Sequence, residues 1–408
     1  MKTRCFKYFA VLTAALLNVT YIFACTSVIF SGKVTESGKP VMMKNRDTGE
    51  LNNRLEYFKG TSFSFIGLVN SPRVKPGEVW AGMNEKGFCI MNTASYNFKE
   101  DNIPDKNMDC EGILMFKALG SCETVDDFEN FLKNYKKPML VEANFGVIDA
   151  NGGAAYFEVN NTRWVKFDVN DSEVAPDGYR VVTNFCESGR PEEYEGWERY
   201  LTASAILKEI PKKENNKYDI DHSTLINGLS RSYRHEFVGL KNIDDYEIFF
   251  DKDFIPRKST ASSTVFEAVR PGQDPKHTIM WSLIGYPAVS VAIPILMGTE
   301  DIIPHYMKKT EGSKNSVLCS TALKLKNENI FHYEISNGSS YMDAAAIRKM
   351  IPISVSVEKF INEDFMSIFT DWEKGKMSDN MFYDAYRCKS KTYYQKYLNA
   401  FGCYLKND

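Results

Sequence analysis

The stretch FACTSVIF (residues 23–30) joins the end of an apolar segment to a run of β-branched and aromatic residues. Three basic residues lie within the first seven positions, residues 9–23 are mostly apolar, and the small residue Ala24 follows them. This order is typical of a secretory signal peptide that is cut after a small residue. We therefore predict a signal peptide over residues 1–24, and a periplasmic or secreted protein whose mature chain begins at Cys25.

Cys25 at a new N-terminus carries two reactive groups, its thiol and a free α-amine. An α-amine has an ordinary pKa of roughly 7.7–8.0 and a thiol one of roughly 8.5. Both values lie close enough to neutral pH for the amine to accept the thiol proton while the sulfur attacks a carbonyl carbon. The position of Cys25 therefore indicates a nucleophile that also supplies its own general base.

Three other interpretations of this segment stay open. The apolar run could remain in place as a membrane anchor, although it is short and contains Asn18. The cut could fall elsewhere and leave Cys25 as an ordinary structural cysteine. Residues 22–25 also loosely resemble a bacterial lipobox, in which the cysteine carries lipid and has no free thiol, but Phe23 fits that pattern poorly.

Bulk composition narrows the classes of function. The chain has 408 residues, 43% of them hydrophobic and 13% aromatic, which is enough apolar material for a globular protein with a large core. Its formal net charge of −3 argues against a nucleic-acid-binding protein, because such proteins carry a basic surplus. No second apolar stretch approaches membrane-spanning length, so we expect no stable membrane span after leader removal.

The cysteines and histidines indicate neither a disulfide framework nor a metal site. Nine cysteines are sparse for a secreted protein of 408 residues, and the sequence does not decide whether Cys110 pairs with Cys122 or Cys388 with Cys403. The five histidines are scattered, and no CxxC or HExxH motif occurs. We predict no metal and no organic cofactor.

Strand patterns and helix patterns alternate in blocks along the chain. Short turns join strand patterns into three expected hairpins, which pair residues 26–30 with 41–43, 79–82 with 88–92, and 145–149 with 154–159. Helical spacing of apolar residues predicts helices at 111–120, 125–135, 196–210, 343–350 and 355–405. Further strands are expected at 63–69, 179–183, 263–269, 278–283 and 288–295. These blocks indicate an α+β fold with largely antiparallel sheets.

The first hairpin has a consequence for the new N-terminus. Its two strands should place Cys25 at one edge of a sheet.

A domain break near residue 300 is a further option, because the late strand group ends there.

Several short motifs occur together in a fixed order. They are Cys25-Thr26-Ser27, Lys44-Asn45-Arg46-Asp47, Gly82-Met83-Asn84-Glu85-Lys86-Gly87-Phe88, Val182-Thr183-Asn184 and Arg199. This set resembles the N-terminal-nucleophile (Ntn) cysteine hydrolases, which include the choloylglycine hydrolase and penicillin V acylase family and the isopenicillin N acyltransferase family. The later run PGQDP (residues 271–275) is similar to the acyltransferase branch. The resemblance implies a four-layer αββα sandwich over residues 25–408, with a helical C-terminal segment from about 341.

The resemblance also implies roles for the matching residues. Cys25 would attack the carbonyl of a linear amide and form a thioester, and Asp47 would bind the α-amine. Asn184, the better match, and Asn92 would donate to the oxyanion. Thr93 or its backbone N–H is the alternative to Asn92, because the register there is uncertain by one or two residues. Arg199 would support the site through ion pairing. From the residues alone, other interpretations stay open. Asp47 could be a turn or cap residue, both asparagines could be loop residues, and Arg199 could form a surface pair with Glu195.

One position departs from the family pattern. The family has arginine three residues before the aspartate, beside the thiol, whereas this chain has Lys44 there and Arg46 one residue before Asp47. On a strand, Lys44 and Arg46 share one face, while Asn45 and Asp47 share the other. A cation beside the sulfur favours the thiolate, and the sequence does not decide which of the two supplies it.

Together these observations predict a secreted amidohydrolase that cleaves linear amide C–N bonds, with acyl transfer as an additional activity. Two alternatives remain: a non-catalytic surface lipoprotein or binding module on the same scaffold, and a dipeptidase-like cysteine peptidase. The expected partner is a small-molecule amide, with no nucleic acid, and the family also includes homo-oligomers. A dipeptidase would need a group that binds a substrate ammonium or carboxylate, and no sequence cluster indicates one. The sequence does not decide the acyl or amine specificity.

Overall fold

A computed structural model describes residues 24–71, 77–245, 247–310, 312–313, 315–334 and 340–405. Of the predicted leader, only Ala24 is among these residues. The rest of the signal-peptide prediction therefore lies outside the described residues.

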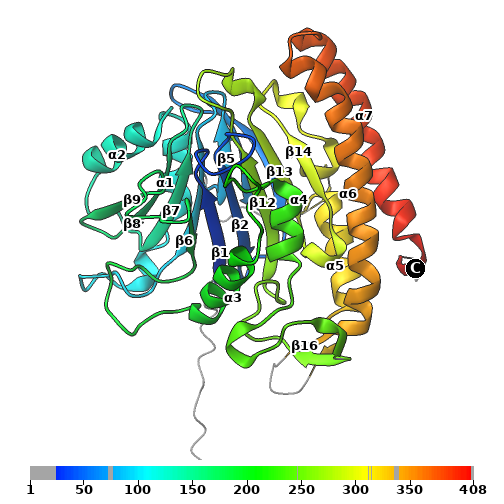
Figure 1. The fold of residues 1–408 in the computed structure, drawn as a ribbon, viewed down its shortest axis with the longest axis horizontal. Helices are drawn as coiled ribbons and strands as arrows, with labels where there is room; N and C mark the ends of the chain where they lie inside the picture. The colour runs from blue at the N-terminus through cyan, green and yellow to red at the C-terminus, as the bar shows by residue number, and fades with distance from the viewer. Residues whose placement is uncertain are drawn as a thin grey trace, which may run out of the picture.

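One sheet has seven strands in the order β3-β4-β5-β6-β7-β8-β9, and every neighbouring pair is antiparallel. The strands are β3 (Asn53–Lys59), β4 (Ser64–Asn70), β5 (Ala81–Asn84), β6 (Cys89–Ala94), β7 (Ala143–Ile148), β8 (Ala154–Val159) and β9 (Trp164–Asp168). The predicted hairpin turn between β5 and β6 is confirmed, because Gly87 adopts a φ of 76° and the Asn84 side chain accepts from the Lys86 and Phe88 amides. Helices α1 (Glu111–Leu119) and α2 (Val125–Asn134) cover the outer face of this sheet (Figure 1).

The second sheet has six strands in the order β10-β1-β2-β12-β13-β14, again antiparallel throughout. The strands are β1 (Cys25–Phe30), β2 (Val41–Asp47), β10 (Tyr179–Val182), β12 (Thr260–Glu267), β13 (Ile279–Ile284) and β14 (Ala292–Ile295). The expectation that Cys25 lies at a sheet edge is wrong. β10 pairs with the outer side of β1, and this partner lies about 150 residues away along the chain, beyond the reach of a hairpin signal.

The two sheets pack face to face between two helical layers. Strands β1 and β2 contact β6, β7 and β8 of the seven-stranded sheet. On the other side lie α3 (Trp197–Lys208), α4 (His222–Leu225), α5 (Val317–Asn329), α6 (Ala344–Glu373) and α7 (Asp379–Ala400) (Figure 1). The predicted α+β class and its four-layer αββα arrangement are therefore confirmed.

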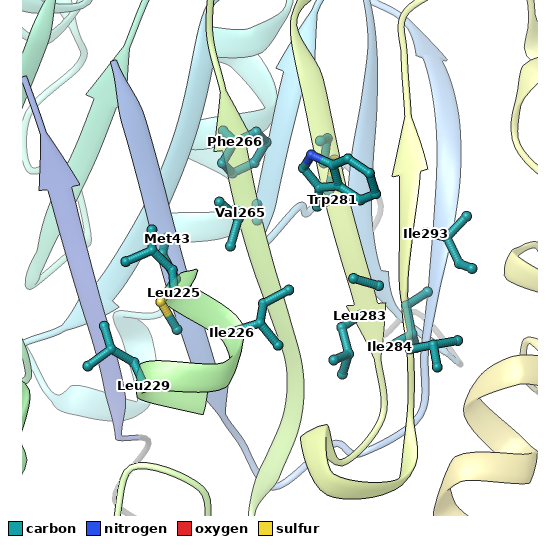
Figure 2. Close-up of a cluster of buried hydrophobic side chains, with 14 of the residues drawn as sticks. Met43, Leu225, Ile226, Leu229, Val265, Phe266, Trp281, Leu283, Ile284 and Ile293 are labelled. Atoms are coloured by element: carbon teal, nitrogen blue, oxygen red, sulfur yellow. The ribbon is translucent and has the colours of Figure 1, made fainter. Parts of the chain in front are cut away.

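A single apolar core joins the six-stranded sheet to its helical layer. Figure 2 shows Leu225, Ile226 and Leu229, from α4 and the π-helical turn after it, beside strands that present Val265 and Trp281. The same core continues through buried side chains of α5, α6 and α7. The option of a domain break near residue 300 is therefore wrong, because one core lies on both sides of that position.

The C-terminal helices differ in extent from the sequence expectation. The helical segment begins at Ala344 rather than at about 341, because β16 (Ser340–Asp343) precedes it and pairs with β11 (Ile248–Phe250) and β15 (Tyr333–Glu334). The expected gap between two helices at 350–355 does not occur, and Pro352 lies inside α6. Buried residues along α6 pack on the core on both sides of the proline, so tertiary packing overrides the local break signal. Within the described residues, no helix combines the length and the apolar character needed to cross a bilayer.

Candidate active site

Cys25 lies at the start of β1 and borders a cavity of about 980 Å³. Its Cα lies directly opposite that of Arg46 on β2, and Ser27 lies opposite Lys44 in the same register. Directly opposite residues of an antiparallel pair project to the same face, so Cys25, Lys44 and Arg46 share one face of the sheet. The pairing of two neighbouring strands thus brings the thiol and both cations to the same cavity.

The backbone of Cys25 is fixed by two buried side chains. Its nitrogen donates to Asn184 Oδ1 at 2.8 Å, and Arg199 Nη2 donates to the same oxygen at 2.9 Å. Arg199 Nη1 donates to the Cys25 carbonyl oxygen and to Thr26 Oγ1. Arg199 is fully buried, so the surface pair with Glu195 that the sequence left open is wrong. Burial lowers the pKa of Arg199 to about 10, which leaves it charged at neutral pH.

The two predicted asparagines lie in different surroundings. Asn184 Nδ2 donates to the Ala94 carbonyl at 2.8 Å, and Asn184 does not border the cavity. Asn92, on β6, does border it, and its Oδ1 accepts from Lys44 Nζ at 2.8 Å. Thr93 points elsewhere, since its hydroxyl accepts from Asn144. Of the two asparagines, Asn92 therefore presents its amide group to the cavity.

Asp47 is buried and has three donors around it. Its Oδ2 accepts from Arg257 Nε at 2.8 Å, and its Oδ1 accepts from Thr260 Oγ1 at 2.6 Å and Asn45 Nδ2 at 3.2 Å. Burial raises the pKa of the Asp47 carboxyl, while the positive charges of Arg257 and Arg199 oppose that rise. The nitrogen of Cys25 donates to Asn184 and not to Asp47 in this structure.

Arg257 is a site residue that the sequence interpretation missed. It lies in the segment before β12, about 210 residues from Asp47, and no motif surrounds it. The pairing of β12 with β2, which sets Thr260 opposite Asp47, brings the two together. Only knowledge of that long-range pairing could have identified Arg257.

Lys44 is buried beside the thiol, and within the described residues its side chain bonds to two neutral oxygens. Its Nζ donates to the Trp80 carbonyl at 2.8 Å and to Asn92 Oδ1 at 2.8 Å. Burial lowers the pKa of Lys44 to about 7; the negative charge of a Cys25 thiolate opposes this shift, and Arg46 adds to it. Lys44 is therefore partly neutral near pH 7.

The lowered pKa of Lys44 makes folding stability depend on pH. The unfolded chain keeps this proton up to its ordinary pKa of 10.5, whereas the folded chain releases it near 7, so stability rises with pH between these values. We expect the free energy of unfolding of the wild type to increase by about 2 kcal/mol from pH 7 to 9 relative to Lys44→Met. Urea unfolding of both proteins at each pH measures the difference, and parallel curves would contradict it.

Arg46 lies on the same cavity wall. Its Nη1 donates to Asn53 Oδ1 at 2.7 Å and its Nη2 to Asn70 Oδ1 at 2.9 Å. The guanidinium lies over the Trp80 ring, 5.0 Å from the ring centroid. Burial lowers the pKa of Arg46 to about 10, so it stays cationic at neutral pH. Both cations that the sequence left as alternatives therefore border the cavity beside Cys25.

Comparisons with known proteins give likenesses of structure only. No family model matches the chain, and no curated protein matches its sequence. Among solved structures, an N-acylethanolamine-hydrolyzing acid amidase ortholog from Caenorhabditis elegans is 15% identical, with 62% of this chain and 95% of that chain covered and a TM-score of 0.41. A mutant conjugated bile acid hydrolase from Clostridium perfringens is 12% identical, with 71% and 98% covered and a TM-score of 0.41. Penicillin V acylase from Agrobacterium tumefaciens is 15% identical, with 67% and 86% covered and a TM-score of 0.40.

Proposed function

We propose that this protein is a secreted amide hydrolase in which Cys25, exposed as the N-terminal residue after leader removal, attacks the carbonyl carbon of a linear amide. The observation that carries the proposal is the position of Cys25. It borders a cavity of about 980 Å³, beside two buried cations, with its nitrogen bonded to a buried asparagine. This arrangement supplies a nucleophile, a fixed base and positive charge within one site.

The first step forms an acyl-enzyme. The α-amine of Cys25 takes the thiol proton, and the sulfur attacks the amide carbon to give a tetrahedral intermediate. The C–N bond then breaks, the ammonium returns its proton to the departing nitrogen, and a thioester on Cys25 and a free amine result.

The second step releases the acid. The same α-amine removes a proton from water, whose oxygen attacks the thioester carbon. Collapse of the second intermediate breaks the C–S bond and returns the proton to sulfur, so one water is consumed for each amide cleaved. A second amine in place of water would give acyl transfer instead.

Asn184, Arg199 and Asp47 would position the α-amine. Asn184 Oδ1 already accepts from the Cys25 nitrogen, and Arg199 ties that oxygen to the Cys25 carbonyl. An amine held by an acceptor at 2.8 Å has a fixed direction for its lone pair after proton loss. The negative charge of Asp47 would favour the ammonium form between the two proton transfers.

Asn92 and Lys44 would stabilise the oxyanion. Lys44 binds Asn92 Oδ1, which directs the amide nitrogen of Asn92 away from the lysine, and Asn92 borders the cavity. A preorganised donor of this kind contributes most when negative charge develops on the carbonyl oxygen. Among the predicted oxyanion donors, we therefore assign Asn92 rather than Asn184.

Removal of this donor has a measurable consequence. We expect Asn92→Ala to lower kcat by about 10²–10³-fold with little change in KM, because the lost bond forms in the transition state. Asn92→Asp keeps the size of the side chain but removes the donor, so it should lose a similar factor. Steady-state kinetics of both variants check this, and a kcat within threefold of the wild type would exclude Asn92 from the oxyanion site.

A substrate panel tests the proposed function as a whole. Purified mature protein is incubated with N-acyl amino acids, bile-acid conjugates, penicillin V and dipeptides, and released amine is measured. We expect at least one linear amide to be cleaved, with no requirement for added metal. Absence of amine release from every compound, by protein shown to begin at an unmodified Cys25, would contradict the proposal.

A further inference from the structure

The segment that carries Asn184, residues 183–186, belongs to no helix or strand. It follows β10, the strand that pairs with the outer side of β1. Several of the bonds that hold it come from one side chain of the seven-stranded sheet. The position of Asn184 matters because its Oδ1 accepts from the Cys25 nitrogen at 2.8 Å. The groups that fix residues 183–186 therefore also fix the acceptor for that nitrogen.

Asn144, on β7, bonds to this segment both before and after Asn184. Its Nδ2 donates to the Thr183 carbonyl at 3.4 Å and to the Phe185 carbonyl at 3.1 Å. Its Oδ1 accepts from Cys186 Sγ at 3.1 Å. The side chain is 1% exposed and does not border the cavity. A single amide group thus holds the two-residue stretch 184–185 at both of its ends.

The chemistry of its partners sets the orientation of the Asn144 amide. Backbone carbonyls only accept, so the amide nitrogen must face them and the amide oxygen must face the thiol. Burial raises the pKa of the Cys186 thiol well above its ordinary value, so the thiol keeps the proton that it donates. A flipped amide would set its oxygen against two carbonyl oxygens. The amide is therefore held in one orientation.

Asn144 is the central member of a polar row across the seven-stranded sheet. It lies opposite Thr93 of β6 and opposite Glu158 of β8, so the three side chains project to the same face. Its Nδ2 reaches Thr93 Oγ1 at 3.1 Å. Glu158 accepts from the backbone nitrogens of residues 187 and 188 at 2.6 and 2.9 Å. The row holds the segment at successive points, and Asn144 is the member whose bonds enclose Asn184.

We propose that Asn144 is a positioning residue for amide hydrolysis: it keeps Asn184 where that side chain accepts from the Cys25 nitrogen. This inference rests on the proposed function and adds to it a residue outside the cavity wall. In the mature chain the nitrogen is the α-amine, and its ammonium form donates to Asn184 Oδ1, which favours that charged form. The neutral amine keeps its lone pair directed at the thiol only while this acceptor stays in place.

Loss of the Asn144 amide should act on turnover rather than on substrate binding. We expect Asn144→Ala to lower kcat by about 10–100-fold per folded molecule, with KM within about twofold of the wild type. The α-amine is a base only when neutral, and an ammonium that loses an acceptor releases its proton more readily. The acid limb of kcat/KM should therefore move to lower pH by about 0.5–1 unit. The variant leaves in place the charged side chains around Cys25, which are Lys44, Arg46, Asp47 and Arg199.

Asn84 provides a matched control, because it is an equally buried asparagine that also holds backbone groups. Its Nδ2 donates to two backbone carbonyls at 2.9 and 2.8 Å, and its Oδ1 accepts from two backbone nitrogens at 3.0 and 3.1 Å. Like Asn144 it is 1% exposed and does not border the cavity. Asn84→Ala should lose stability but keep the kcat and the acid limb of the wild type. An equal loss of kcat in both alanine variants, or an Asn144→Ala with kcat within threefold of the wild type, would overturn the inference.

The Cys186 thiol allows a milder test if Asn144→Ala does not fold. Cys186→Ser keeps a donor for the Asn144 oxygen, whereas Cys186→Ala removes it. We expect Cys186→Ala to lower kcat by about 3–10-fold and to move the acid limb to lower pH, and Cys186→Ser to restore both. In that case the pair decides, because equal kcat values and equal acid limbs for the two Cys186 variants would contradict a role for Asn144.

A measurement without substrate keeps the inference separate from the proposed function. The rate at which iodoacetamide alkylates Cys25, followed by the mass of the N-terminal peptide, reports the thiolate fraction, which the neighbouring ammonium favours. Asn144→Ala should react about 2–5-fold more slowly than the wild type at pH 7, and Asn84→Ala at the wild-type rate. Equal rates for wild type and Asn144→Ala would refute the inference even if amides are cleaved. A slower variant of a wild type that cleaves no amide would refute the proposed function alone.

Discussion

Replacement of Cys25 by alanine is expected to reduce amide hydrolysis to the background rate, a loss of about 10⁶-fold, with the fold intact. The sulfur forms the only covalent bond to the substrate in the proposed mechanism, so no other side chain can take its place. The side chain is small and lies at the border of a cavity, so its truncation creates little new empty volume. Thermal unfolding should therefore change by no more than a few degrees.

A second buried cysteine provides the matched control. Cys122 lies between α1 and α2, away from the cavity, and burial raises the pKa of its thiol to about 12, so it is inert as a nucleophile. Cys122→Ala should keep full activity per folded molecule, measured as amine release after correction for the folded fraction. Substantial turnover by Cys25→Ala, or loss of turnover in Cys122→Ala alone, would reject the assignment of the nucleophile.

Retention of a single residue before Cys25 should also have a large effect. In the structure the Cys25 nitrogen is the amide of the Ala24–Cys25 bond, and it donates to Asn184. An amide nitrogen has no basic lone pair, so it cannot take the thiol proton. We expect a chain that begins at Ala24 to be about 10²–10⁴-fold slower in kcat than one that begins at Cys25, which is the usual contribution of a general base.

Lys44 is a second candidate for the general base, and the same experiment tests it. Its pKa of about 7 leaves a fraction of neutral amine near the thiol at neutral pH. If Lys44 rather than the α-amine were the base, chains beginning at Ala24 and at Cys25 would be equally active, and Lys44→Met would inactivate both. Rates of the two chains on one amide, each with and without Lys44→Met, decide between the bases.

Local patterns predicted many elements of the fold but missed β3, β9 and α5, and the site residues came from the family resemblance. Alternating apolar residues and turn residues identified the hairpins β5–β6 and β7–β8, because both signals lie within one short segment. The family resemblance, through the motif around Asn184 and the position of Arg199, led to side chains that contact the Cys25 backbone. These two residues are close to each other in the chain, since Asn184 follows β10 and Arg199 lies in α3, the next helix.

Long-range pairing was beyond the reach of those patterns. The insertion of β1 between β10 and β2 depends on segments far apart in the chain, and the contact of Arg257 with Asp47 depends on the pairing of β12 with β2. The partner of Asp47 is likewise a property of packing, since Asp47 directly follows Arg46 in the sequence but bonds to Arg257. From sequence spacing alone, Asp47 would be paired with its neighbour Arg46 instead of with Arg257.

The central claim is that Cys25 is a free N-terminal residue that becomes acylated. The most direct measurement is mass spectrometry of the exported protein, quenched in acid during turnover of a slow N-acyl substrate and then digested. We expect a peptide that begins at Cys25, with the mass of the acyl group on its sulfur and sensitivity to hydroxylamine. A peptide that still contains Ala24, a diacylglycerol on Cys25, or an acyl group on another cysteine would contradict it.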